Sequence, residues 1–295
     1  MTKRRAAGRR KATGPRRKKR VVSWWQEKPP GRRFPDKAGE VICADALALL
    51  KALRSNIADI VFLDPPFNLG KIYGSRGARQ DRRPEGDYLA FMTEVIGQAV
   101  RVLRSGGSLY LYHIPRWAVR LAPILQKELR FCHWIAISMK NGYPRRKGLY
   151  PAHYALLHYT KGAPAVLRRP QIPPPVCPHC DEFIRDYGGY REHVEDGINL
   201  SDVWDDLSPV RHLKYKLRGA NELPLAIPKR AVEMSGRRNG LLVDPFAGTG
   251  SAIVLARLEG MKAIAGDIEM ANCRLILQRL AAIRQRKRRK QPVKG

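Results

Sequence analysis

Residues 240–267 constrain the fold more than any other segment of this chain. They form, in order, an apolar strand, an acid, a glycine-rich turn, a helix, a second strand and a final acid: 240–243, Asp244, Phe246-Ala247-Gly248-Thr249-Gly250, 251–258, 263–265 and Asp267. That order is a βαβ unit with a nucleotide-type site at the turn. The glycines let the backbone turn sharply and let a ligand approach it closely. The alternative is an ordinary strand-to-helix turn without a ligand.

The chain before this unit also alternates short apolar runs with amphipathic stretches. Strands are predicted at 41–44, 60–63, 108–112, 132–137 and 154–159, and helices at 46–53 and 88–103, with Gly106-Gly107 closing the second helix. A last helix is predicted through Ile283. The pattern fails between about 161 and 223, which indicates an inserted module rather than part of the sheet. We therefore predict an α/β fold with a mainly parallel sheet, helices on both faces and a small irregular insert.

The positive charge gathers at the two ends. Residues 1–20 hold 11 Lys and Arg, residues 281–295 hold seven more, and neither segment has an acid. Removing these 18 charges from the net charge of +30 leaves +12 for the rest, which is apolar enough to fold. We expect disordered basic tails at 1–20 and 284–295 and a polyanionic partner, by default nucleic acid.

A second motif, Asp64-Pro65-Pro66-Phe67, directly follows the apolar run at 60–63. The two prolines cannot continue a central strand, so the tetrapeptide is predicted just beyond a strand's carboxyl end. It resembles the catalytic motif of amino-group DNA methyltransferases. In the β class of that family this block precedes the F-x-G-x-G block, a circular permutation, and the same order occurs here. Flanking blocks at 44–46, 101–110 and 153–159 are also similar, so the resemblance covers about 39–283.

The resemblance implies a Rossmann-like methyltransferase fold and S-adenosylmethionine as cofactor. The catalytic residues would be Asp64, Pro65, Pro66 and Phe67. The cofactor would contact Asp45, Asp244, Phe246, Ala247, Gly248, Thr249, Gly250 and Asp267. An Asp at the first position of the tetrapeptide is typical of enzymes that methylate adenine N6, whereas Ser is usual for cytosine N4. The implied reaction is methylation of a flipped adenine in double-stranded DNA, with cytosine N4 as the alternative.

These residue types suit that chemistry. The carboxylate of Asp64 and the carbonyl of Pro65 both accept hydrogen bonds from an amino group, and rigid prolines hold them in place. The ring of Phe67 offers a stacking face for a base swung out of the duplex. A non-catalytic DNA-binding protein that retains the fold is the alternative from another class. It would be expected to have lost Asp64 or the glycine-rich turn, and both are present.

The loop that follows the tetrapeptide is predicted to contact DNA phosphates. Between residues 71 and 83 it carries one acid and five basic residues, Lys71, Arg76, Arg79, Arg82 and Arg83. Its position beside Phe67 favours contact with DNA over a merely solvated loop.

Cys177 and Cys180 form a Cys-x-x-Cys pair, and His193 follows them. This spacing is half of a zinc motif, so it fits either a structural zinc ion or two free thiols in a turn, and it does not by itself define a metal site.

The predicted organisation is a catalytic half at 21–161, a target-recognition insert at 162–220 and a cofactor-binding half at 221–283. No apolar run approaches the length of about 18 residues expected of a membrane helix. Five cysteines fit a reducing compartment. We expect a cytoplasmic, nucleoid-associated protein, with a nuclear address as the alternative use of the N-terminal basic cluster. Related enzymes are often homodimers, and the residues give no indication of a restriction-enzyme partner.

Overall fold

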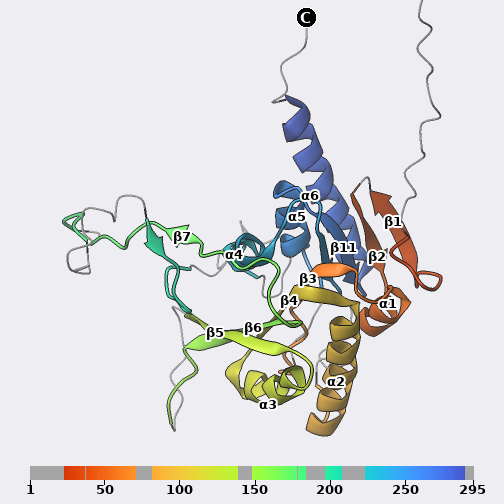
Figure 1. Ribbon diagram of the computed structural model, residues 1–295, viewed down its shortest axis with the longest axis horizontal. Coiled ribbons are helices and arrows are strands. Elements are labelled where there is room, and N and C mark those ends of the chain that lie inside the picture. Colours follow the sequence, from red (N-terminus) through yellow and green to blue (C-terminus); the bar gives the residue numbers. More distant parts are fainter. Residues whose placement is uncertain are drawn as a thin grey trace, which may run out of the picture.

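The computed structural model describes residues 23–36, 38–70, 82–138, 148–177, 179–183, 197–207 and 223–289. Within them, nine strands form one sheet in the order β1-β2-β11-β10-β3-β4-β6-β5-β9 (Figure 1). Their bounds are β1 Arg32–Asp36, β2 Gly39–Cys43, β3 Ala58–Leu63, β4 Leu103–His113, β5 Arg130–Ser138, β6 His153–Thr160, β9 Val203–Trp204, β10 Leu241–Asp244 and β11 Lys262–Asp267. The five neighbours from β2 to β4 are parallel, whereas β1 and β6 run antiparallel to their partners.

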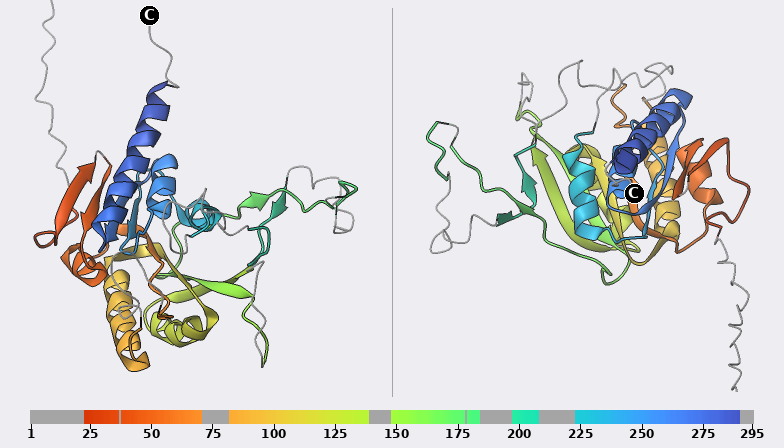
Figure 2. Two further views of the ribbon diagram at one scale, coloured as in Figure 1. Left: turned by 180° about the vertical axis from the view of Figure 1, so that it is seen from behind. Right: turned by 90° about the horizontal axis from the view of Figure 1, so that it is seen from above.

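Helices cover both faces of this sheet (Figure 2). They are α1 Ala46–Ala52, α2 Glu85–Val102, α3 Pro115–Gln126, α4 Ala226–Ser235, α5 Ser251–Leu258 and α6 Met270–Arg289. Two apolar cores result, because successive side chains of a strand point to opposite faces. In β3, Val61 and Leu63 join the core beneath α1 to α3, while Ile60 and Phe62 join the core beneath α4 to α6. The predicted α/β architecture is confirmed.

The residues at 103–107 differ from the prediction. Helix α2 ends at Val102, and Gly106-Gly107 lies inside β4 rather than closing a helix. The reason is backbone pairing: the Gly106 N–H donates to the Lys161 carbonyl at 2.7 Å, and the Lys161 N–H donates to the Gly107 carbonyl at 3.0 Å. Gly106 has a φ of +71°, which a residue with a side chain rarely adopts. The α5 helix, by contrast, has the predicted bounds.

The predicted insert at 162–220 contains the short strands β7 (Gln171–Ile172) and β8 (Ile198–Asn199), which pair with each other in a segment extending away from the main sheet (Figure 1). The end of this segment differs from the prediction of a module outside the sheet, because β9 pairs with β5 of the main sheet. Trp204 of β9 is only 1% exposed and belongs to the core beneath α4 to α6. The insert therefore contributes its last described strand to the sheet.

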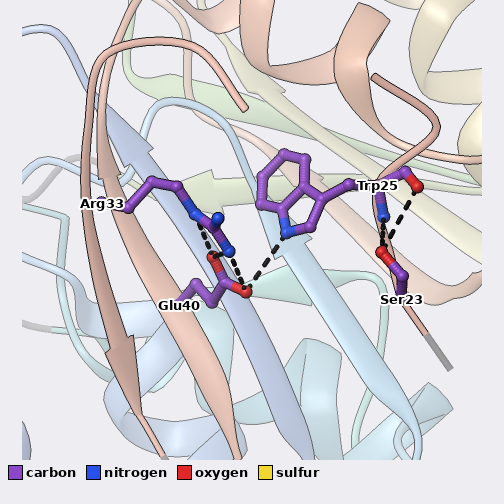
Figure 3. Close-up of polar contacts among 4 residues, drawn as sticks. All are labelled: Ser23, Trp25, Arg33 and Glu40. Carbon is purple, nitrogen blue, oxygen red and sulfur yellow. Dashed lines mark hydrogen bonds and ion pairs between the residues drawn. The ribbon is translucent and has the colours of Figure 1, made fainter. Parts of the chain in front are cut away.

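A cluster of polar contacts fixes the opposite edge of the sheet (Figure 3). Arg33 of β1 forms an ion pair with Glu40 of β2 at 2.7 Å, and the indole N–H of Trp25 donates to the same carboxylate at 3.2 Å. The Trp25 ring is itself nearly buried in the core beneath α1 to α3. These contacts tie Trp25 and β1 to β2. Among the described helices, none is long and apolar enough to cross a bilayer.

Candidate active site at the carboxyl edge of the sheet

Five adjacent parallel strands place a polar residue at the same edge of the sheet, because parallel strands end on the same side. Asp45 follows β2, Asp267 ends β11, Asp244 ends β10, Asp64 follows β3 and His113 ends β4. The four acids named from the sequence therefore meet at one edge. His113 was not among the predicted site residues.

The turn at 246–250 is held by hydrogen bonds to strand ends. The Asp267 carboxylate accepts the Gly248 N–H at 2.9 Å, and the Gly266 carbonyl accepts the Ala247 N–H at 2.8 Å. The carbonyl of the buried Thr249 accepts from Arg279 of α6 at 2.5 Å. The turn is thus a rigid rim beside β10 and β11.

Gly250 has room for no side chain. Its φ is +78°, and an added Cβ would lie 2.6 Å from Cγ1 of Ile276. Gly248 also has a positive φ, of +51°. Both glycines are therefore required by the backbone, as the sequence indicated.

The Asp244 side chain is buried and accepts the backbone N–H of Phe246 at 3.1 Å. Burial, and next the negative charge of Asp64, raise the pKa of Asp244 well above its ordinary value. Strands β3 and β10 pair directly in parallel, so the tetrapeptide after β3 lies beside the glycine-rich turn after β10. The two sequence motifs, 180 residues apart, therefore form one site, which a positively charged ligand would suit electrostatically.

Asp45 has a local structural function. Its carboxylate caps the amino end of α1 by accepting the N–H groups of Leu47 at 2.9 Å and Ala48 at 3.2 Å. Its place beside β11 also puts it at the predicted site, since the Ala44 N–H bonds to the Asp267 carbonyl at 3.1 Å. A cofactor contact by Asp45 stays a prediction.

In the tetrapeptide, Pro65 is buried, Asp64 is partly buried and Pro66 is exposed. The Phe67 ring is 7% exposed. Its centroid lies 5.7 Å from those of Tyr112 and Tyr154, and 4.9 Å from that of His113. Burial first, and the charge of Asp64 second, raise the pKa values of both tyrosines, which places Asp64 near this aromatic group.

Sequence analysis missed Tyr112, His113 and Tyr154, since all three lie in ordinary strand patterns. The available signal was their position near strand ends: His113 ends β4, and Tyr154 is the second residue of the antiparallel neighbour β6. Only the pairing of His113 with Ala155 brings them together.

Of the predicted DNA-contacting residues, Arg82 and Arg83 are exposed, while Lys71, Arg76 and Arg79 lie outside the described residues. The side chain of Asn68 anchors the end of this loop: it accepts the Arg83 N–H at 2.7 Å and donates to the Arg83 carbonyl at 3.0 Å. The Arg83 guanidinium stacks over Phe91 at 4.3 Å. The Arg83 end of the basic loop therefore lies beside the tetrapeptide.

Cys177 and Cys180 lie in a tight turn in which the Asp181 N–H donates to the Cys177 carbonyl at 2.9 Å. Backbone hydrogen bonds, the one with His179 first, lower the pKa of the Cys177 thiol. In the part of the chain that the structure describes, no three His, Cys, Asp or Glu side chains gather as metal ligands, and His193 lies outside that part. The zinc alternative gains no support.

Comparison with known proteins agrees with this geometry. A family model described as DNA methylase, for the N6 and N4 methyltransferases, matches residues 58–278. The type II methyltransferase M.BamHI of Bacillus amyloliquefaciens is 39% identical over 244 residues, which are 82% of this chain and 57% of that protein. The chain therefore spans just over half the length of that relative. The DNA adenine methyltransferase YhdJ of Escherichia coli (strain K12) is 25% identical over 84% of both chains.

Solved structures share the fold. The PvuII DNA methyltransferase, described as cytosine-N4-specific, superposes with a TM-score of 0.59 at 14% identity, covering 82% of this chain and 86% of that one. The M1.HpyAVI complex with SAM gives a TM-score of 0.56 at 17% identity, covering 82% and 98%. The Rossmann-like fold expected from the sequence is thus confirmed.

Proposed function

The chain belongs to the N6/N4 DNA methylase family, and from that premise we propose that it transfers a methyl group from S-adenosylmethionine to an exocyclic amino nitrogen of a base in DNA. The direct parallel pairing of β3 with β10 carries the proposal, since it sets the tetrapeptide after β3 beside the glycine-rich turn after β10. A donor bound at the turn and an amino group bound at Asp64 would then be neighbours. Proximity of that kind is a major part of catalysis between two substrates.

The cofactor would lie against the turn at 246–250, between Asp267 and Asp244. Its adenosine part suits the close backbone approach allowed by Gly248 and Gly250. S-adenosylmethionine supplies the methyl group on a positively charged sulfur, which makes the group ready to transfer. The carboxylates at this edge would stabilise that charge.

The tetrapeptide would prepare the acceptor nitrogen. An exocyclic amino group is a weak nucleophile, because its lone pair is delocalised into the base ring. Hydrogen bonds to the Asp64 carboxylate and the Pro65 carbonyl would draw the lone pair out of conjugation and aim it at the methyl group. The base has to leave the duplex first, and the aromatic group around Phe67 would receive it.

We propose adenine N6 as the acceptor, on the basis of the Asp at position 64. Arg82, Arg83 and the remainder of the basic loop would contact phosphates next to the flipped base. The terminal charges would add affinity that is independent of sequence. The similar proteins named above are bacterial, which supports this use of the N-terminal cluster over a nuclear address.

The test is incubation of the purified protein with methyl-labelled cofactor and unmethylated plasmid DNA. We expect label in DNA, and N6-methyladenine on mass spectrometry of the digested nucleosides. The Asp64→Ala variant should lose at least about 10³-fold in rate, as expected when a positioned acceptor in an active site is removed. Label in N4-methylcytosine would mean that the acceptor is cytosine N4 and not adenine N6. Absence of label with the wild type, or equal label with Asp64→Ala, would overturn the proposal.

The predicted C-terminal tail at 284–295 begins inside α6, because this helix continues to Arg289. Removal of residues 1–20 and 290–295, which leaves the helix intact, tests the assignment of the tails. The truncated protein should bind DNA with a shallower dependence on salt while methylating the same site, because fewer counterions are released. A changed methylation site would mean that the tails take part in recognition.

A further inference from the structure

A buried pair of side chains, Tyr88 and His113, contacts the tetrapeptide from the protein interior. The hydroxyl oxygen of Tyr88 lies 2.6 Å from the carbonyl oxygen of Pro66 and 2.7 Å from Nε2 of His113. Nδ1 of His113 lies 2.9 Å from the backbone nitrogen of Ile114. Tyr88 comes from the first turn of α2, and His113 from the end of β4. Both side chains are almost completely buried, at 2% and 0% exposed.

The partners fix the direction of every hydrogen bond in this chain. The Ile114 N–H can only donate, so Nδ1 of His113 accepts and carries no proton. A neutral imidazole then has its proton on Nε2, which donates to the Tyr88 oxygen. The single proton of the Tyr88 hydroxyl is left for the Pro66 carbonyl, which can only accept. Burial lowers the pKa of His113 to about 3, in agreement with a neutral ring.

Pro66 is exposed as a residue, yet its carbonyl has a partner inside the protein. The buried Tyr88 hydroxyl donates to this carbonyl, and the buried His113 ring in turn bonds to Tyr88. The Pro66 carbonyl sets the plane of the peptide that joins Pro66 to Phe67, and the Phe67 ring also contacts His113. His113 therefore contacts the tetrapeptide twice, through Tyr88 and through the ring.

We propose that Tyr88 and His113 are positioning residues for methyl transfer: they hold the Pro66–Phe67 peptide, and with it the Pro65 carbonyl and the Phe67 ring, in the orientation that receives the acceptor base. This inference rests on the proposed function. Neither side chain touches the substrates in this scheme. Their effect is geometric, and displacement of reacting groups by about 1 Å costs about 10²-fold in rate.

The chain offers a matched control for the Tyr88 hydroxyl. Tyr110 is also fully buried, and its hydroxyl lies 2.6 Å from Oγ of Ser235, which links β4 to α4. Tyr110→Phe therefore removes a buried hydroxyl bond of the same kind that does not reach the tetrapeptide. A general loss of stability would affect Tyr88→Phe and Tyr110→Phe alike.

The experiment measures single-turnover methyl transfer with full-length protein, labelled S-adenosylmethionine and unmethylated plasmid DNA. We expect Tyr88→Phe to lower the single-turnover rate about 30- to 100-fold, in line with displaced reacting groups, with cofactor and DNA dissociation constants within about twofold of wild type. Tyr110→Phe should stay within about twofold in rate. Equal losses in both variants, or a Tyr88→Phe effect confined to substrate binding, would overturn the inference.

A spectroscopic measurement separates this inference from the proposed function. Nitrogen-15 NMR of the histidines in the protein at neutral pH should show His113 as the Nε2–H tautomer. In Tyr88→Phe the Nε2 signal should shift, because its acceptor is lost, while Tyr110→Phe leaves it in place. An inactive wild type with this tautomer would overturn the proposed function, and with it the positioning role, but would leave the hydrogen-bond chain standing. A protonated His113 or an Nδ1–H tautomer would overturn the hydrogen-bond chain, whatever the activity.

Discussion

The two halves of the site are built in different ways. The proposed cofactor side, from Asp244 to Asp267, is made of backbone groups and carboxylates within one βαβ unit. The proposed acceptor side combines Phe67 with Tyr88, His113 and Tyr154, which come from three further elements. A cofactor that is the same in every turnover suits a rigid local frame. A base that has to enter and leave suits a surface assembled from side chains, whose shape follows from packing between elements.

The largest effect on the cofactor side is expected from Gly250→Val. A β-branched residue at a φ of +78°, with its Cβ against Ile276, strains the backbone by about 1–3 kcal/mol and displaces the turn. Cofactor affinity measured by calorimetry should fall about 10- to 100-fold. The double variant Gly250→Ala with Ile276→Ala removes the clash but keeps the strain, so it should recover part of the affinity. Unchanged affinity in Gly250→Val would separate the turn from the cofactor.

On the acceptor side, Phe67→Leu is expected to reduce methyl transfer about tenfold, since stacking of a base on an aromatic ring contributes about 1–3 kcal/mol. Cofactor affinity should not change. Phe131→Leu is the control: this ring also contacts a tyrosine, Tyr159, but is 47% exposed at the start of β5, away from the site's edge. A loss of cofactor affinity in Phe67→Leu would show that the two sides are not separable.

The contrast also explains what the sequence could predict. The cofactor side could be predicted because strand, turn, helix and acid follow one another within 28 residues, and α5 has the predicted bounds. The tetrapeptide was found because two prolines have few places in a sheet. These signals are local, so no knowledge of strand order was needed to identify them.

The aromatic group and the Tyr88–His113 pair could not be predicted in the same way. His113 approaches Tyr154 because β6 runs antiparallel beside β4, and nothing within either strand's sequence specifies that neighbour. Tyr88 looked like one more apolar contact of an amphipathic helix. The Gly106-Gly107 assignment failed for a related reason, since pairing with Lys161 across the sheet overrode the local tendency of glycine to end a helix.

Asp244→Asn tests whether the buried carboxyl group of Asp244 lowers the stability of the folded protein at high pH. The pKa of Asp244 is raised in the folded protein, so the folded state keeps a proton that the unfolded chain loses as pH rises above about 4. Wild-type stability from this group is therefore present at low pH and lost as pH increases. Asn resembles the protonated acid and cannot ionise. The variant should match wild type near pH 4 and melt about 2–4 °C higher at pH 8, as for a gain of about 1 kcal/mol.

The same variant should bind the cofactor more weakly. The positive charge of the bound cofactor would favour the ionised form of Asp244, and Asn cannot supply that negative charge. Melting curves across pH and calorimetry on one protein preparation measure both effects. A variant that is more stable and binds equally well would remove Asp244 from the cofactor side. A melting difference that is independent of pH would mean that ionisation of Asp244 is not the cause.

The smallest effect is expected where neither side is touched. Gly97 lies on the exposed face of α2, and an added Cβ would meet nothing within 4 Å. Gly97→Ala should stabilise the protein by about 0.5–1 kcal/mol, because alanine loses less backbone entropy in a helix. Helix α2 also carries Tyr88, so a more stable helix tests whether positioning depends on local geometry or on helix stability. Urea unfolding should report the gain, while transfer rate and cofactor affinity stay at wild-type values. An altered rate would mean that fraying of α2 controls the geometry of the acceptor side. The hydrogen bonds of Tyr88 and His113 would then follow from the order of the helix and would not themselves position the tetrapeptide.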